Sequence, residues 1–373
     1  MGSCEFSYGG GIVSTVVKVI GLGGGGSNTV ARMVEFGVQG VEFIAANTDA
    51  QVLRTNPAPV KLLLGPHTTR GNGAGGRPEI GRKAAEESRE ALREVLAGAD
   101  MVFLTAGMGG GTGTGAIAVA AEVAKAQGAV TISVVTTPFA FEGTRRAKNA
   151  AAGLRSLREH TDTLVVVPND RLLKVAPRNL SLEAAFRLAD EVLRRAIQGI
   201  TDIITQTGVI NRDFNDIKRL MASGGGALIS MGTGKGEKRV EEAIHAALSN
   251  PLLGHISLAT ATGVLANFVG GDDLSLWEVV GGMEALHARL PEEADVVWGF
   301  STDPNFTGRV QLTLLVTGVG GVPLAASTRV GKQAERVAVP PPTATTPSAA
   351  AVPAADLDVP AFLRRRLRST TVG

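Results

Sequence analysis

Short apolar runs alternate with helix-forming segments through the first half of the chain. The apolar runs predict strands buried on both faces, at residues 16–20, 41–46, 61–64, 101–105, 129–135 and 164–167. The segments between them predict helices, at residues 27–36, 78–96, 115–127 and 145–158. Because strands that alternate with helices are typical of a parallel sheet covered on both sides, we expect a doubly wound α/β domain over residues 16–180.

A longer helical pattern follows this domain. Ser181 is placed to cap a helix that runs to about Thr205. Apolar residues recur along it at steps of three and four, at Leu182, Phe186, Ala189, Leu193, Ile197, Ile200 and Ile204. Val192, Ala196 and Ile203 widen this stripe beyond one narrow face. We therefore expect a long central helix over 181–206 that is covered on two sides, as a spine between two domains.

The second half has a looser alternation of elements. It predicts strands at 227–231, 263–269, 296–300 and 310–316, with helices at 238–248 and 276–289. We expect a smaller α+β domain over 207–325. Residues 1–15 predict a flexible leader, and the Ala-, Thr- and Pro-rich residues 326–355 predict a disordered linker because they cannot build a core.

Composition narrows the class of protein. The chain has 373 residues, of which 44% are hydrophobic and 19% charged, as in a globular protein. A formal net charge of +2 and only 4% aromatic residues argue against a nucleic-acid partner. The single cysteine, Cys4, cannot form an internal disulfide, which favours a reducing compartment. No signal-peptide pattern and no apolar run of about 18 residues occurs, so we expect no membrane span.

Three glycine clusters follow predicted strands, at residues 21–26, 71–76 and 107–115. Glycine lets backbone N–H groups approach an anion closely, and a helix that starts there adds its positive dipole. The first cluster alone also fits a dinucleotide loop or a structural turn. The third adds Thr112 and Thr114, and several such loops on one sheet edge indicate a polyphosphate. No lysine ends the cluster as in a P-loop, so backbone amides and a metal ion must balance the phosphate charge.

The third cluster carries a specific resemblance. Gly109–Gly115 reads GGGTGTG, and this segment resembles the signature of the tubulin/FtsZ family of GTPases as bacterial cell-division members carry it. Four further segments are similar to that family in the same order, at Val41–Leu53, Gly73–Ala85, Pro138–Gly143 and Val167–Leu173. The likeness runs almost the whole length of the chain, and it implies GTP or GDP as ligand with Mg²⁺.

The resemblance also implies site residues. The glycine loops would hold the phosphates, Glu142 and Arg146 would lie near the ribose and phosphates, and four residues would surround the guanine. The residues so implied are Gly23, Gly24, Gly25, Gly26, Asn28, Gly75, Gly76, Gly109, Gly110, Gly111, Thr112, Gly113, Thr114, Gly115, Glu142, Arg146, Asn169, Phe186 and Asp190.

Chemistry supports two of the guanine contacts independently. The Asp190 carboxylate can accept from guanine N1–H and N2–H₂, a pair of donors that adenine lacks. Phe186 lies one helical turn earlier and is placed to stack on the base. The alternatives are a solvated helix charge for Asp190, a core aromatic for Phe186 and turn chemistry for Asn28.

Gly208–Lys218 resembles the family's acidic loop that completes hydrolysis. It implies that Asp213 and Asp216 polarise the attacking water and that Asn211 helps to position the phosphates. A helix over 181–206 would place this loop at the opposite end of the molecule from the glycine loops. The next subunit of a head-to-tail stack would then supply the acids. By spacing alone, two aspartates in a solvated loop remain the plainer interpretation.

Two residues depart from the family pattern, and the first of them, Asn215, stands where a small residue is usual. Arg212 stands where an apolar residue is usual, and we hypothesise that it tunes the interface or acts on the neighbour's phosphates. A solvated side chain is the alternative.

Residues 356–373 resemble the family's C-terminal recognition peptide followed by a basic tail. The peptide residues that would bind membrane-tethering and regulatory division proteins are Asp356, Leu357, Val359, Pro360, Phe362 and Leu363. The resemblance thus implies a cytoplasmic protein that polymerises with itself at the division site, on the inner face of the membrane. A non-division cytoskeletal GTPase, a filament that binds without hydrolysis and an NAD-dependent oxidoreductase remain alternatives.

Overall fold

The computed structural model describes residues 15–174, 176–177, 179–205, 214–222, 225–252 and 258–319. All of them belong to one compact unit, Met1–Leu324. The predicted leader, linker and C-terminal peptide, which includes Asp356, Leu357, Val359, Pro360, Phe362 and Leu363, lie outside the described residues.

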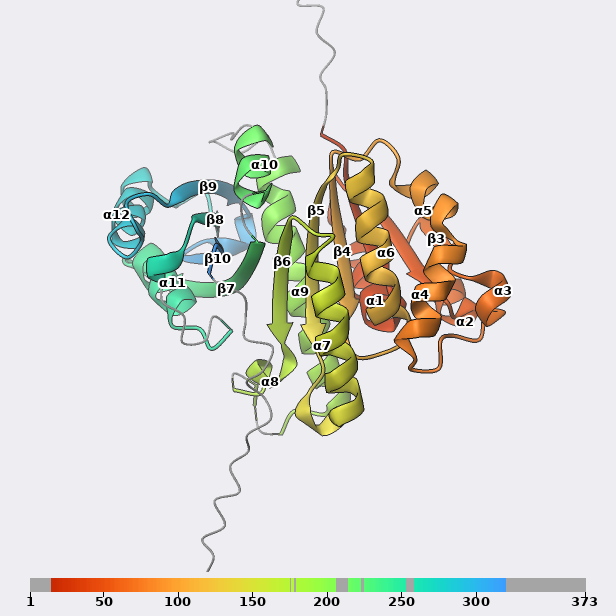
Figure 1. Cartoon of the computed structure of the whole chain (residues 1–373). Helices are drawn as coiled ribbons and strands as arrows, with labels where there is room; N and C mark the ends of the chain where they lie inside the picture. Colours follow the sequence, from red (N-terminus) through yellow and green to blue (C-terminus); the bar gives the residue numbers. More distant parts are fainter. Residues whose placement is uncertain are drawn as a thin grey trace, which may run out of the picture. The chain divides into compact units, whose positions relative to one another are not determined.

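The described strands form one ten-stranded sheet in the order β3-β2-β1-β4-β5-β6-β7-β10-β8-β9 (Figure 1). The strands of the first half are β1 (Val17–Leu22), β2 (Glu42–Asn47), β3 (Val60–Leu63), β4 (Met101–Gly107), β5 (Val130–Thr137) and β6 (Thr163–Pro168). They are all parallel, and the register sets Val19 of β1 beside Phe43 of β2 and Phe103 of β4. The predicted doubly wound parallel sheet is therefore confirmed.

Helices cover both faces of this parallel sheet. They are α1 (Gly23–Glu35), α2 (Ala50–Thr55), α3 (Pro66–Thr69), α4 (Pro78–Glu87), α5 (Arg89–Leu96), α6 (Thr112–Ala126), α7 (Thr144–Arg158), α8 (Asn169–Leu172) and α9 (Leu182–Thr205), with the short η1 (Ala140–Glu142). On one face, Val17 and Val19 of β1 share a core with α1 and α9. On the other face, Ile20 and Leu22 share a core with α4, α5, α6 and α7. Because both faces are buried, the strands read as continuous apolar runs.

The second half continues the sheet with a change of direction. Its elements are α10 (Phe214–Ala222), β7 (Gly225–Lys235), α11 (Arg239–Leu248), η2 (Leu258–Thr260), β8 (Gly263–Gly270), α12 (Leu276–His287), β9 (Asp295–Thr302), η3 (Pro304–Phe306) and β10 (Arg309–Thr317). The start of β7 pairs in parallel with β6, whereas β10 is antiparallel to both β7 and β8. One face of β7, β8 and β10 packs against α11 and α12.

The helix α9 is the predicted long central helix. It contacts β5 of the parallel sheet and also β8, β9 and β10 of the second half (Figure 1). Its apolar residues share one core with Val165 of β6 and Leu265 of β8. The wide apolar stripe is explained by this burial on two sides. The Ser181 hydroxyl accepts a hydrogen bond from Ala184 N at 3.2 Å, which is the predicted N-cap contact.

Several predicted elements have different bounds in the structure, and four of the differences have a clear cause or bear on the site. The single helix expected over 78–96 is interrupted at Ser88, whose hydroxyl accepts a hydrogen bond from Gly65 N. The helices expected from residues 27 and 115 begin earlier, at Gly23 and Thr112, because the glycines form part of the first turn. Asp216, expected in a loop, lies in the first turn of α10.

Candidate functional site

The glycine loops meet at the carboxyl edge of the parallel sheet, the edge at which β1 to β6 end. Strand β1 lies between β2 and β4, so the chain leaves it first to one side of the sheet and later to the other. In open α/β sheets, ligands bind where the strand order reverses in this way. The first glycine cluster follows β1 directly and the third follows β4, so both border this switch point.

Two helix N-termini converge there. A Cβ atom built on Gly23, at the start of α1, would lie 2.6 Å from Gly113 N in the first turn of α6. Neither helix has a side-chain hydrogen bond at its N-cap. The first N–H groups of a helix have no partner within the helix, and the helix dipole makes this end positive. Together the two ends form a place where anionic oxygens would be bound.

The glycines of these loops fall into two groups. Some are required by close packing, since a Cβ on Gly26 would lie 2.2 Å from the Thr105 carbonyl oxygen and one on Gly115 would lie 2.1 Å from that of Pro78. Gly24 and Gly110 are different, because their φ angles are ordinary and no atom lies within 4 Å of a Cβ built on them. Neither packing nor backbone conformation explains glycine at these two positions. A bare backbone that a ligand can approach does explain it.

The second glycine cluster is fastened beside the other two. Gly73 N donates to the Thr48 carbonyl at 3.0 Å, and the Thr48 hydroxyl lies 2.6 Å from the Thr112 hydroxyl. The Asn149 amide of α7 donates to the carbonyls of Gly76 at 3.4 Å and Gly109 at 3.3 Å. The loops that carry Gly75, Gly76 and Gly109–Gly111 are thereby brought together. Asn149 was missed in the sequence, where a lone amide on a helix gives no signal.

The two threonines of GGGTGTG have partners inside the protein. The Thr114 hydroxyl accepts a hydrogen bond from Gly109 N at 2.8 Å and is buried. The Thr112 hydroxyl is engaged with Thr48. Both hydroxyls therefore help to shape the loop. The Thr114 hydroxyl accepts this bond, so its own proton can still be donated, and the prediction that the two threonines contact phosphate stays a prediction.

The loop after β5 adds charged groups at the same edge. The Glu142 carboxylate accepts from Phe139 N at 2.9 Å and pairs with Arg146 at 2.5 Å. Asp170 of α8 accepts from Ala140 N at 2.9 Å, which ties this loop to the end of β6. Glu142 is thus mostly occupied within the protein, while Arg146 is exposed and available to an anion.

The residues predicted around a base lie on α1, α8 and α9. The Asp190 side chain is only 13% exposed, and its carboxylate lies 3.5 Å from Arg32 Nε of α1. Burial raises the pKa of Asp190 to about 6, against the opposing effect of Arg32. The alternative of a solvated helix charge is therefore excluded. Arg32, one turn beyond the exposed Asn28, was missed in the sequence.

Two more of the residues predicted around the base, Asn169 and Phe186, have surroundings that suit contact with a ligand. Asn169 is 5% exposed, and its Oδ1 atom has no hydrogen-bond partner. The Ser27 hydroxyl of α1 is likewise buried without a partner. Such orphaned polar atoms are rare and are usually satisfied by a ligand or water. Phe186 is half-exposed and packs edge-on against Phe139, with centroids 5.6 Å apart, so it is not a core aromatic.

Asp216 lies at the amino edge of the parallel sheet, far along the strands from the glycine loops. Thr163, the first residue of β6, donates to the Met221 carbonyl of α10. The last residue of β6, Pro168, precedes Asn169. Figure 1 accordingly shows α10 near the start of the β6 arrow and α8 near its head. Asn211, Arg212 and Asp213 lie outside the described residues.

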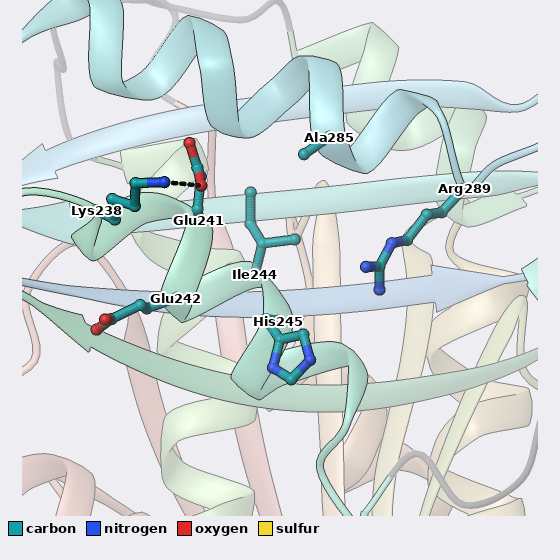
Figure 2. A pocket seen from close by; sticks show the side chains of 7 residues that line it. All are labelled: Lys238, Glu241, Glu242, Ile244, His245, Ala285 and Arg289. Atoms are coloured by element: carbon teal, nitrogen blue, oxygen red, sulfur yellow. Dashed lines mark ion pairs between the residues drawn. The ribbon is translucent and has the colours of Figure 1, made fainter.

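Two hollows lie away from this edge. One of about 300 Å³ is formed by α11 and α12, with the Lys238–Glu241 ion pair at 4.0 Å and the exposed His245 and Arg289 at its rim (Figure 2). The other, of about 550 Å³, lies between α9 and the second half, where the amide of Asn267 is buried without a partner. Neither includes a residue that the sequence predicted for the site.

Two further searches of the described residues gave no candidate. No group of three or more His, Cys, Asp or Glu side chains among them is arranged to hold a metal ion. None of the helices in the described ranges combines the length and apolarity needed to cross a membrane.

Comparison with known proteins agrees with this arrangement. The family model "Tubulin/FtsZ family, GTPase domain" matches residues 16–177, and "FtsZ family, C-terminal domain" matches residues 225–320. The chain is 45% identical to FtsZ of M. jannaschii, solved as an empty dimer, with a TM-score of 0.80 over 82% of this chain and 89% of that one. CetZ1 of Haloferax volcanii, solved as a GDP-bound monomer, shares the fold at 21% identity and a TM-score of 0.69, over 83% of this chain and 96% of that one.

Proposed function

Because this chain belongs to the tubulin/FtsZ family of GTPases, we propose that it binds GTP at the carboxyl edge and hydrolyses it while assembling head to tail. The observation that carries the proposal is the pair of uncapped helix N-termini at the switch point, bordered by Gly24 and Gly110. Two N-termini and three loops supply more N–H donors than a single phosphate needs. A polyphosphate matches that number.

The base would lie toward α8 and α9. An ionised Asp190 accepts from guanine N1–H and N2–H₂, and the orphaned Asn169 Oδ1 offers a further acceptor. The burial of Asp190 favours its protonated form, and the nearby Arg32 opposes this by favouring the ionised carboxylate. A buried acceptor pair of this kind discriminates against a base that lacks the donors. The half-exposed Phe186 ring is supported at the same edge by its edge-on contact with the buried Phe139.

Hydrolysis would be completed by a neighbouring subunit. Asp216 lies at the amino edge, so one chain cannot bring it to its own glycine loops. If the amino edge of one copy stacks on the carboxyl edge of the next, Asp216 of the first copy reaches the glycine loops of the second. Asp216, with Asn211 and Asp213 of the preceding segment, would then orient the attacking water, as phosphoryl transfer requires. Arg212 of the same segment would face the neighbour's phosphates.

Exposed apolar residues support a head-to-tail contact. Phe141, Leu173, Leu182 and Phe186 are exposed in or beside the segments that follow β5 and β6, and we group them as the carboxyl-edge patch. Leu276, Trp277 and Val280 form a separate α12 patch, in which Trp277 is 81% exposed. Large exposed apolar side chains that lie near one another often mark interaction sites. Two different patches on one chain suit a heterologous contact, which propagates into a filament. The M. jannaschii FtsZ relative was solved as a dimer.

Mg²⁺ is part of the proposal as a partner of the nucleotide. The described residues offer no acidic cluster for it, so the phosphate oxygens and water would supply most of its ligands. When bound, it would neutralise charge on the phosphates.

We assign the filament to bacterial cell division, with the C-terminal peptide as the docking segment for tethering proteins. The resemblance of residues 356–363 to the family's recognition peptide supports this role over a non-division cytoskeletal one. An NAD-dependent oxidoreductase leaves GGGTGTG without a purpose.

The test is the GTPase rate per subunit as a function of protein concentration, for wild type and Asp216→Ala. We expect wild-type turnover to rise steeply above a threshold concentration, together with light scattering, and Asp216→Ala to assemble with little turnover. Equal turnover per subunit at every concentration would contradict assembly-dependent hydrolysis. Scattering that responds to NADH and not to GTP would contradict the nucleotide assignment.

A further inference from the structure

The short helix α8 fastens four parts of the molecule to one another. Asn169 presents its orphaned Oδ1, and Asp170 holds the loop after β5 through Ala140 N. Leu172 is buried in the core beneath α9. Arg171 reaches in a different direction, toward the second half of the chain. Consecutive residues thus connect the proposed base site, the loop that carries Glu142 and the C-terminal strands.

The contact made by Arg171 continues as a chain of hydrogen bonds. Arg171 Nη1 donates to the Leu252 carbonyl at 2.7 Å. Leu252 N donates to Asn250 Oδ1 at 2.9 Å, and Asn250 Nδ2 donates to the Met231 carbonyl of β7 at 2.8 Å. The Leu252 side chain is itself buried in the same core as Leu172. The carboxyl edge is therefore linked to β7, the strand by which the second half joins the parallel sheet.

This contact is a costly way to stabilise a fold. Arg171 is half-buried, and desolvation lowers its pKa. It donates to a carbonyl oxygen, and no carboxylate among the described residues forms an ion pair with it to offset the loss of hydration. A partly buried cation held in this way contributes less stability than an apolar side chain of similar size. Its directional hydrogen bond, in contrast, fixes the position of α8 relative to the turn at residues 250–252.

We propose that Arg171 is a positioning residue for the nucleotide site and that the Arg171–Leu252–Asn250 chain couples nucleotide affinity to the second half of the molecule. The proposal rests on the proposed function, in which Asn169 contacts the guanine. Holding α8 in place sets the position of Asn169, two residues away, and of the loop bonded to Asp170. Coupling of this kind is reciprocal, so bound nucleotide also stabilises the link to β7.

The experiment measures GDP dissociation from the full-length protein, kept dilute enough to remain monomeric, with a fluorescent GDP analogue. We expect Arg171→Met to weaken GDP binding by roughly tenfold, within the usual range for coupled sites. Arg171→Lys, which keeps a donor, should recover most of the affinity. Asn250→Ala should weaken binding in the same direction, and the double variant should be weakened less than the two single effects predict together.

The matched control is Arg187→Met. Arg187 is an exposed arginine near the start of α9 and pairs only at the surface with Glu183. We expect it to leave GDP affinity unchanged. Thermal unfolding of the ligand-free variants separates positioning from plain stability.

If Arg171→Met lowers the unfolding temperature but leaves GDP affinity within twofold of wild type, Arg171 is merely structural and the proposal is overturned. Fully additive effects of Arg171→Met and Asn250→Ala would equally overturn the coupling. A wild-type protein that binds no GDP would instead remove the proposed function on which the inference rests.

Discussion

Two helix starts in this molecule have opposite chemistry. At the carboxyl edge, α1 begins at Gly23 and α6 begins directly after Gly111, and neither helix has a side-chain cap. At the start of α12, Ser275 and Glu278 form a complete capping box, and the buried Arg239 clamps Glu278 at 2.8 Å and Asp273 at 2.5 Å. The first N–H groups of the helix therefore lack side-chain partners at α1 and α6, whereas the capping box supplies one at α12. An uncapped start alone does not mark a binding function, because α4, α5, α7 and α11 also lack a side-chain cap. What distinguishes α1 and α6 is that their two uncapped starts meet beside glycines that neither packing nor backbone conformation requires.

The largest expected effect comes from closing the open helix start with charge. Gly110→Asp should fold, because a side chain there has space and an ordinary φ. Its carboxylate would lie where phosphates are expected, so we predict a loss of GTP affinity of about 100-fold or more. Equilibrium binding and circular dichroism measure the two quantities. Gly110→Asn is the neutral control of the same size. Wild-type affinity in Gly110→Asp would refute the anion site.

The capped helix start should respond in the reverse way. Arg239→Met leaves Glu278 and Asp273 without their cation, which we expect to lower the free energy of unfolding by about 2 kcal/mol, less than for a fully buried pair because Asp273 is 40% exposed. GDP affinity of the monomer should not change. Denaturant titration and GDP binding check the two halves of this prediction. A large loss of affinity would mean that the two regions do not differ in function as proposed.

The α12 patch provides a smaller effect that is confined to assembly. Trp277→Glu adds charge to an exposed apolar group, so we expect the concentration needed for assembly to rise about tenfold, as for a moderate hot spot. Sedimentation with GTP measures this threshold. Val60→Glu, at an exposed residue of β3 outside both patches, is the control and should assemble normally. Unchanged assembly of Trp277→Glu would exclude the α12 patch from the contact.

The smallest expected effect is on pH dependence at the carboxyl edge. Asp190 must be ionised to accept from guanine, and its pKa in the folded protein is about 6. GDP affinity should therefore fall by up to about tenfold from pH 7 to pH 5. The ligand-free protein should show the opposite sign. Because the folded pKa lies above the unfolded value, the stabilisation from protonated Asp190 is full below about pH 4 and is lost as pH rises through about 6.

Asp190→Asn serves as the reference for both measurements. The difference in unfolding temperature between wild type and variant should change with pH over this window, and the variant's GDP affinity should be weak and nearly independent of pH. A wild-type GDP affinity that does not vary between pH 5 and pH 7 would remove the proposed role of Asp190.

Most of the strands could be predicted from sequence because β1 to β6 are buried on both faces and their apolar runs are continuous. The break at Ser88 could not, since its cause is Gly65 N in a loop remote in sequence. The helix α10 was predictable from the helical spacing of the buried Ile217, Leu220 and Met221, although its start lies in a segment that resembles a loop.

The site was predictable only in part, because some of its residues act through contacts with segments that are distant in sequence. Clustered glycines indicate that a ligand approaches the backbone closely, so the three loops could be predicted from the sequence. Asn149 and Arg32 act through contacts with distant segments, with the Gly76 carbonyl and the Asp190 carboxylate respectively. A single sequence carries no record of such pairings. The placement of Asp216 at the amino edge required the three-dimensional position of α10.

The central claim, that two subunits share each hydrolytic site, is tested most directly by mixing two inactive variants. Asp216→Ala keeps an intact carboxyl edge, and Gly110→Asp keeps an intact α10. Each alone should hydrolyse GTP at a few per cent of the wild-type rate or less. An equal mixture should recover activity, up to roughly a quarter of the wild-type rate, because one junction in four then pairs an intact nucleotide site with an intact Asp216. A mixture no faster than the sum of its separate components would contradict the account.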